Sequence, residues 1–141
     1  ADCDLIGLGV SAVSRIGATY SQNAKNLDEY FDMLDQGLFP VLSGIHLTRD
    51  DLIRRAVIMA LICQGEVLFE SIEVAHLVDF QKYFAAELLA LHDMVERGLV
   101  TVSDAAITVT PTGALVMPAV AMVFDHYLQM DRARARFSQI I

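Results

Sequence analysis

The sequence predicts a mainly α-helical fold with a small β-hairpin wing: a winged-helix-like C-terminal domain preceded by a short strand or loop and a helix. Three observations predict it. Apolar residues recur at helical spacing over residues 49–64 and again over 79–97. β-Branched residues alternate in two short runs, 99–102 and 107–110, and another helical pattern follows them. The order helix, short helix, longer helix, hairpin, helix is typical of a winged helix, and we assign it to residues 26–141.

The composition indicates a folded domain. Of the 141 residues, 55% are hydrophobic and 20% are charged, so the chain can bury enough apolar surface to offset its ordering entropy. The longest apolar stretch, 114–124, contains Pro118 and is shorter than the roughly 20 residues that span a bilayer. No signal peptide opens the sequence, so we expect a cytoplasmic protein without a membrane span. Because the chain begins with Ala1, we expect it to be processed or excised from a longer protein.

Residues 1–25 are expected to be a strand and a linker. Residues 2–14 are apolar, contain glycines and have no helical period, which predicts a short buried strand followed by a loop. A lone strand has no sheet to join, so we expect its partner strands to lie outside this chain. Residues 17–25 are polar and predict a loop.

A first helix is predicted to begin after Asn26, a candidate N-cap that acidic residues follow in the first turn. Gly37 is placed to end this helix, and Pro40 and Gly44 then indicate a loop. The apolar stripe of the helix consists of Leu27, Tyr30, Phe31 and Leu34.

Thr48 is the clearest N-cap in the sequence. Asp50 and Asp51 follow it in the first turn, where the helix dipole favours acidic side chains. The apolar period predicts a helix over 49–64, and Gly65 stands where a left-handed cap belongs.

The remaining elements complete the predicted wing. Ser71 can cap a short helix through Leu77, and a longer helix follows over 79–97. The two strand patterns then flank a turn at Ser103-Asp104. The last helix is predicted to run to about Phe137, with Pro118 either in its first turn or at a kink.

The charge of the predicted helix-and-wing unit, residues 65–110, argues against a nucleic-acid partner. In a winged helix the helix before the wing enters the DNA groove. Residues 65–110 carry two basic and eight acidic residues, and the whole chain has a net charge of -8. Such a surface would repel phosphates, so we expect no nucleic-acid binding and a surface that packs against another protein domain.

Arg49, Arg54 and Arg55 belong to the densest charged segment and are candidates for a substrate or domain interface. The structural interpretation is a solvated helix face on which the pairs Asp50–Arg54 and Asp51–Arg55 each stabilise the helix by a few tenths of a kcal/mol. The functional interpretation is a docking face, because the planar guanidinium group suits bidentate pairing with carboxylates of a partner domain or an anionic substrate.

No catalytic or metal-binding pattern is present. The four histidines have no metal-ligand spacing, and Cys3 and Cys63, which are 60 positions apart, are expected to be reduced thiols. Gly7-x-Gly9 lacks the glycine-rich strand-to-helix turn of a nucleotide site. We therefore predict no catalytic residue and no metal ligand in this chain.

Specific strings, however, occur in order along essentially the whole chain. They are Ala1-Asp2-Cys3-Asp4-Leu5-Ile6-Gly7-Leu8-Gly9-Val10-Ser11-Ala12, Ile16-Gly17 with Tyr20, Gln22 and Asn23, Leu47-Thr48-Arg49-Asp50-Asp51, Ile53-Arg54-Arg55, Leu61-Ile62-Cys63, Phe80 with Tyr83-Phe84, Gly98-Leu99-Val100, Phe124-Asp125, Tyr127-Leu128 and Phe137-Ser138. In these strings the chain resembles the C-terminal part of oxygen-independent coproporphyrinogen III oxidase, a radical S-adenosylmethionine family of haem biosynthesis.

The resemblance implies a parent oxidoreductase that oxidatively decarboxylates two propionates of coproporphyrinogen III to vinyl groups, giving protoporphyrinogen IX. It implies S-adenosylmethionine and a 4Fe–4S cluster in that parent, the cluster held by a three-cysteine motif that this chain lacks. We therefore expect residues 1–25 to be a remnant of the parent's N-terminal catalytic barrel. The C-terminal domain would cover the substrate side of that barrel, hold no cofactor of its own and be inactive alone.

The resemblance also assigns candidate cofactor residues. Val13 stands where the family lines a S-adenosylmethionine site, although plain core packing would explain the same residue type. Gly7 and Gly9 fit a strand that a cofactor or another backbone approaches closely.

Some positions depart from the family. Gln64 stands where the family usually has Asn, and Pro118 and Ala119 stand where it usually has Arg-Asn. A divergent oxidase or a paralogue with another porphyrin task therefore stays open. The alternative to the enzyme domain is an independent winged-helix interaction or regulatory module.

Overall fold

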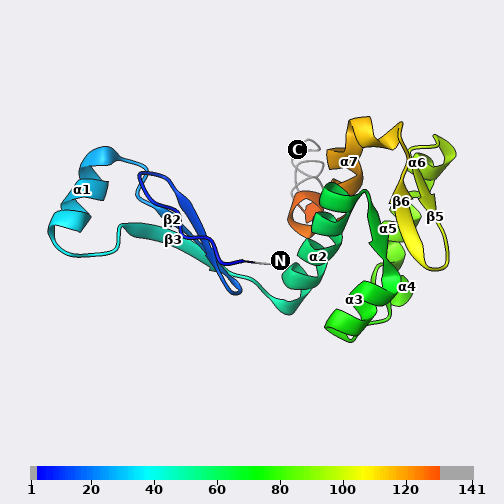
Figure 1. The fold of residues 1–141 in the computed structure, drawn as a ribbon, viewed down its shortest axis with the longest axis horizontal. Coiled ribbons are helices and arrows are strands. Elements are labelled where there is room, and N and C mark those ends of the chain that lie inside the picture. Colours follow the sequence, from blue (N-terminus) through cyan, green and yellow to red (C-terminus); the bar gives the residue numbers. More distant parts are fainter. Residues whose placement is uncertain (1–2, 131–141) are drawn as a thin grey trace, which may run out of the picture. The chain divides into compact units, whose positions relative to one another are not determined.

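The computed structural model describes residues 3–130, and its contacts divide the chain into two compact units, unit 1 (1–52) and unit 2 (53–141). Each unit contains one three-stranded antiparallel sheet and helices, so the chain is mixed α/β (Figure 1). The predicted helices and the hairpin are largely confirmed, whereas a whole sheet in unit 1 was not predicted. The predicted domain boundary after residue 25 stays a prediction.

The sheet of unit 1 has the strand order β1-β2-β3. Its strands are β1 (Val13–Ile16), β2 (Thr19–Asn23) and β3 (Val41–His46). Gly17, with φ of 54°, supplies the left-handed conformation that a two-residue hairpin turn between β1 and β2 requires.

Three predictions for unit 1 are wrong. The polar segment 17–25 is largely a central strand instead of a loop, and the segment around Gly44 is the strand β3. The segment from residue 3 to residue 12 does not form a buried strand: Leu5 makes an isolated bridge to Arg15, while Leu5, Ile6 and Leu8 are exposed. The polar strand escaped detection because its backbone is paired with strands on both sides, and that pairing does not depend on apolar side chains.

Helix α1 (Leu27–Asp35) is confirmed together with its cap. The Asn26 side chain accepts a hydrogen bond from the Asp28 backbone N–H at 2.8 Å, which satisfies one of the unpaired donors at the helix start. Gly37, with φ of 71°, follows the end of the helix. No residue of α1 is buried, including the apolar stripe.

The sheet of unit 2 joins an unpredicted strand to the predicted hairpin, in the order β4-β6-β5. Its strands are β4 (Glu66–Leu68), β5 (Val100–Val102) and β6 (Ala106–Val109). The preceding helix, α2 (Arg49–Gln64), has the predicted bounds, and Gly65 takes the predicted left-handed conformation with φ of 72°. With only three residues, β4 was too short to show a period in the sequence.

The predicted long helix over 79–97 is three short helices. They follow α3 (Phe69–His76) as α4 (Phe80–Tyr83), α5 (Ala85–Ala90) and α6 (His92–Glu96). The breaks fall at Phe84 and Leu91, which are both fully buried in the core. Helix α3 begins before the predicted cap Ser71, and Leu77 ends it in a left-handed conformation.

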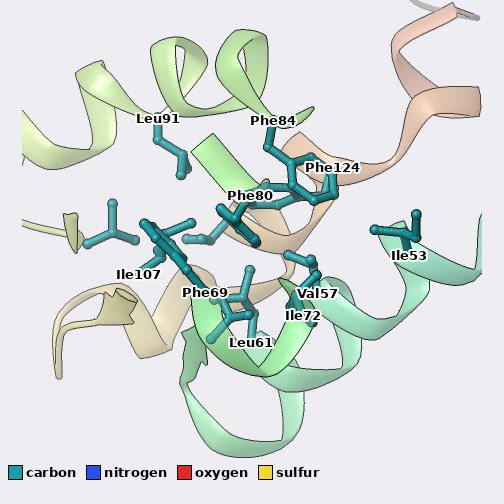
Figure 2. Close-up of a cluster of buried hydrophobic side chains, with 13 residues drawn as sticks. Ile53, Val57, Leu61, Phe69, Ile72, Phe80, Phe84, Leu91, Ile107 and Phe124 are labelled. Atoms are coloured by element: carbon teal, nitrogen blue, oxygen red, sulfur yellow. The ribbon is translucent and has the colours of Figure 1, made fainter. Parts of the chain in front are cut away.

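Unit 2 contains a hydrophobic core of thirteen buried residues, shown in Figure 2. The rings of Phe69 and Phe80 stack at 4.1 Å between centroids, and Phe84 meets the ring of Phe124 edge-on at 5.4 Å. The core consists of Ile53, Val57, Leu61, Val67, Phe69, Ile72, Phe80, Phe84, Leu91, Val100, Ile107, Val120 and Phe124.

The segment after the hairpin forms the short helices η1 (Gly113–Val116), α7 (Met117–Ala121) and η2 (Met122–Phe124). Pro118 lies in the first turn of α7, which confirms one of its two predicted placements. Gly113 is required by close approach, because a Cβ atom there would lie 1.8 Å from the Leu99 carbonyl oxygen. The predicted helix end near Phe137 lies outside the described residues.

Candidate functional site

An open hollow of about 300 Å³ lies on one face of the sheet in unit 1. Its lining includes Val13, the candidate cofactor residue that the sequence singled out. The residues around the hollow are Val13, Tyr20, Ser21, Gln22, Ser43, Gly44 and Ile45. Its lining therefore combines aliphatic, aromatic and polar groups, as is usual in small-molecule sites.

The strand register explains why these side chains share a face. Val13 is opposite Gln22, and Gln22 is opposite Ser43, so the three form one row across β1, β2 and β3. Residues directly opposite each other in antiparallel strands project to the same side of the sheet. Tyr20 and Ile45 are also opposite each other, and they lie in the next row on the same face. Val13 is 47% exposed there, so plain core packing does not explain it.

The Gly7–Gly9 segment lies against the start of β1 and the end of β2. Asn23 donates its side-chain N–H groups to the Gly7 and Gly9 carbonyl oxygens, at 3.3 and 2.9 Å. The Gly7 N–H donates to the Ser14 hydroxyl at 3.0 Å, and the Gly9 N–H donates to the Tyr30 hydroxyl at 3.2 Å. Ser14 and Asn23 are the two buried polar residues of the described chain, and both are satisfied by this loop.

Close packing accounts for Gly7, and backbone conformation accounts for Gly9. A Cβ atom on Gly7 would lie 2.6 Å from the Val13 carbonyl oxygen, and Gly9 has a φ of 104°, which side chains rarely adopt. The backbone that approaches Gly7 closely is therefore the chain's own strand β1. A cofactor contact at either glycine stays a prediction.

Arg54 is held inside unit 2. Its Nη1 atom donates to Glu87 Oε1 at 2.7 Å and to the Phe124 carbonyl oxygen at 3.3 Å, and its guanidinium lies 5.5 Å from the centre of the Phe84 ring. The two charged side chains are only 14% and 15% exposed. Arg54 thus connects α2 with α5 and η2, which is a structural reason for an arginine here. Its role at an interface stays a prediction.

The other two arginines lie on the same helix. Arg49 is exposed at the start of α2, and Arg55 is half-buried. Thr48 is confirmed as the N-cap, and it forms a capping box with Asp51. The Asp51 carboxylate accepts from the Thr48 N–H at 2.8 Å, and the Thr48 hydroxyl accepts from the Asp51 N–H at 3.2 Å. Asp51 therefore caps the helix, and this role does not depend on the pair with Arg55 that its i,i+4 spacing suggested.

The titratable groups of the described residues do not form a metal or cluster site. Within residues 3–130 no group of three or more His, Cys, Asp or Glu side chains is placed to hold a metal ion. Cys3 and Cys63 are both free thiols, one in each unit. Because a 4Fe–4S cluster takes several thiolate ligands, the described residues do not fit one. No helix in the described range is long and apolar enough to cross a membrane.

From the sequence, no site was assigned to four side chains that share the hollow with Val13, namely Tyr20, Gln22, Ser43 and Ile45. The available signal was the alternation of side chains in a strand, since Tyr20 and Gln22 are two apart, as are Ser43 and Ile45. That signal needs the strand assignment first, and the polar composition of β2 had predicted a loop.

Comparisons with known proteins find one family and similar proteins. Residues 47–116 match the protein family described as the HemN C-terminal domain. The chain is 42% identical to oxygen-independent coproporphyrinogen III oxidase from Pseudomonas aeruginosa over 99% of its length, and 41% identical to the enzyme of that name from Escherichia coli. It spans only 30% and 31% of those two proteins.

A solved structure is also similar. The coproporphyrinogen III oxidase HemN from Escherichia coli, a radical SAM enzyme, superposes with a TM-score of 0.86 at 43% identity. The match covers 89% of this chain and 29% of that one. The positions that depart from the family pattern are exposed: Gln64 at the end of α2, and Pro118 and Ala119 in α7.

Proposed function

The chain belongs, through residues 47–116, to the HemN C-terminal domain family, and we propose on that premise that it is the C-terminal part of an oxygen-independent coproporphyrinogen III oxidase. The observation that carries the proposal is the superposition on the Escherichia coli enzyme, which includes 89% of the chain at 43% identity. The proposed parent converts coproporphyrinogen III to protoporphyrinogen IX by decarboxylating two propionates. In it, this part covers the substrate side of the catalytic barrel and is inactive alone.

The hollow in unit 1 supports a contact with S-adenosylmethionine. When bound, this cofactor supplies the radical that removes hydrogen from the substrate side chain. Val13 and Ile45 offer aliphatic surface, Tyr20 offers a ring, and Gln22 and Ser43 offer polar groups. This set suits one wall around a nucleoside-like ligand, and the volume of about 300 Å³ is at the small end for such sites. The remaining walls would come from the barrel.

The contribution of this chain to the reaction is binding and exclusion of water. The loop bonded by Asn23, Ser14 and Tyr30 fixes the backbone beside Val13, so the hollow keeps its shape when a ligand arrives. A pre-formed wall lowers the entropy that ordering would cost on binding. No proton transfer is assigned to the described residues, and the cluster chemistry belongs to the parent.

We also infer that unit 2 is a winged helix. The order α2, β4, α3, the α4–α6 segment and the β5–β6 hairpin, with β4 paired to β6, supports it. The acidic excess of residues 65–110 keeps it from nucleic acid. An independent interaction module is the second candidate, and the core within unit 2 favours it because such a unit can fold alone.

A chimera separates the two candidates. The C-terminal part of the Escherichia coli oxidase would be replaced by this chain, and anaerobic conversion of coproporphyrinogen would be measured by chromatography of the oxidised porphyrins. We expect the chimera to form protoporphyrin, and we expect neither the truncated oxidase nor the 1–141 chain to do so. A folded chimera that carries its cluster but forms no product would contradict the enzyme proposal and favour the independent module.

A further inference from the structure

The row Val13–Gln22–Ser43 places two polar side chains next to the candidate cofactor residue. The three residues are directly opposite one another on β1, β2 and β3, and all three line the hollow. Side chains opposite each other across antiparallel strands have Cβ atoms about 4.5–5.5 Å apart. A small ligand that rests on Val13 is therefore within reach of Gln22 and Ser43.

Gln22 is oriented by its own chain. Its side-chain amide N–H donates to the Ser11 carbonyl oxygen at 3.2 Å, at the end of the loop that Asn23 and Tyr30 hold. A donor engaged in this way leaves the amide oxygen of Gln22 as a free acceptor. Ser43 is exposed on the edge strand, and within residues 3–130 its hydroxyl makes no hydrogen bond to the protein. A hydroxyl can donate or accept a hydrogen bond. The row therefore presents the Gln22 amide oxygen as an acceptor and the Ser43 hydroxyl as a donor or an acceptor.

We propose that Gln22 and Ser43 bind polar groups of S-adenosylmethionine while Val13 contacts its apolar part. This inference rests on the proposed function, and it extends the cofactor surface from one residue to a row across three strands. The Gln22 oxygen accepts from a hydroxyl or ammonium group of the ligand, and the Ser43 hydroxyl completes a second polar contact. The two residues favour S-adenosylmethionine over a purely apolar occupant of the hollow, such as a side chain from another domain.

The test is the affinity of the full-length parent enzyme for S-adenosylmethionine, measured anaerobically by equilibrium dialysis without turnover. Gln22→Leu and Ser43→Ala should each raise the dissociation constant about tenfold, the usual effect of one lost hydrogen bond. Gln22→Glu keeps an acceptor oxygen and should bind more tightly than Gln22→Leu. Thr19→Val is the matched control, because Thr19 is on β2 but projects to the opposite face of the sheet. The affinity of this variant for S-adenosylmethionine should stay within about twofold of the wild-type affinity.

Two further measurements make every outcome decisive. Thermal melting of each variant identifies any general loss of folding, which would lower the affinity of that variant without the loss of a contact to the cofactor. Val13→Asp tests the proposed function by itself. If Val13→Asp weakens binding while the Gln22 and Ser43 variants bind like the wild type, the present inference is overturned and the cofactor contact stands. If Val13→Asp also leaves the affinity unchanged, the placement of the cofactor at this hollow is wrong.

Discussion

The two units of this chain bury apolar side chains to very different extents. Unit 2 contains four phenylalanines in one cluster of buried residues. Unit 1 buries the polar residues Ser14 and Asn23 and the small residue Ala24. Its large apolar side chains Phe31 and Phe39 are exposed. Both units have a three-stranded sheet, so secondary structure alone does not make a core.

The difference indicates how each unit is stabilised. The helices and strands of unit 2 bring thirteen buried apolar residues together, and burial of that kind is the main favourable term in folding. Unit 1 is held by the hairpin ladders and by polar contacts to glycine carbonyls, each of which adds little net stability. We therefore expect unit 2 to fold on its own and unit 1 to depend on surface from the rest of the parent protein.

Phenylalanine truncation gives the largest expected contrast. Phe84→Ala removes a fully buried ring that contacts Phe80 and Phe124, and it should lower the free energy of unfolding by about 3–5 kcal/mol. Phe31→Ala removes a ring that is 54% exposed and should cost less than about 1 kcal/mol. Urea unfolding of the 1–141 chain measures both. Equal losses would mean that unit 1 has a core that its structure does not show.

Arginine truncation gives an intermediate contrast. Arg54→Met keeps the aliphatic stem but leaves Glu87 without its buried partner, and it should cost about 2–3 kcal/mol. Arg49→Met changes an exposed charge and should cost less than about 1 kcal/mol. The midpoint of denaturant unfolding reports both variants. A neutral Arg54→Met would show that the ion pair contributes nothing and would return Arg54 to the candidates for a docking face.

The pair Asp79–Lys82 should give the smallest effect. The hydrogen bond from the Lys82 side chain lowers the pKa of the exposed Asp79, and the same bond raises the pKa of Lys82. A carboxyl group with a lowered pKa stabilises the folded state at any pH above its pKa in the unfolded chain, which is about 3.9. This stabilisation is lost as the pH falls through the pKa of the folded state. The raised pKa of Lys82 also stabilises the folded state, and this stabilisation is lost as the pH rises through the pKa of Lys82 in the folded state.

Asp79→Asn isolates this effect, because Asn keeps the N-cap of α4 and removes the charge. We expect a slightly lower unfolding midpoint than the wild type at pH 7. The difference should vanish at a pH below the folded pKa of Asp79. A difference that is the same at both values of pH would assign it to the cap geometry instead of the ion pair.

Local signals in the sequence were sufficient for some elements and insufficient for others. The bounds of α2 follow from Thr48 at one end and Gly65 at the other, and both act on the residues next to them. In contrast, β2 pairs with a strand about twenty positions away, and its polar residues carry no burial signal. The Arg54–Glu87 pair joins residues 33 positions apart, so i,i+4 spacing suggested other partners.

The candidate site shows the same limit. Val13 was found through a family resemblance, and its neighbours became visible only when the register of β1, β2 and β3 was known. A one-residue slip in that register would turn Gln22 and Ser43 to the other face of the sheet. Close approach of a backbone was expected at Gly7 and Gly9 and is found at Gly7, whereas Gly9 has a positive φ. The sequence did not indicate that Asn23 holds this segment.

Amide hydrogen exchange of the 1–141 chain tests most directly whether only unit 2 has a stable core. We predict slow exchange for backbone amides around Val57, Leu61 and Phe84, with opening free energies close to that of global unfolding. The amides of β2 and β3 should exchange orders of magnitude faster and gain protection in the full-length parent. Equally slow exchange in both units of the isolated chain would contradict this account.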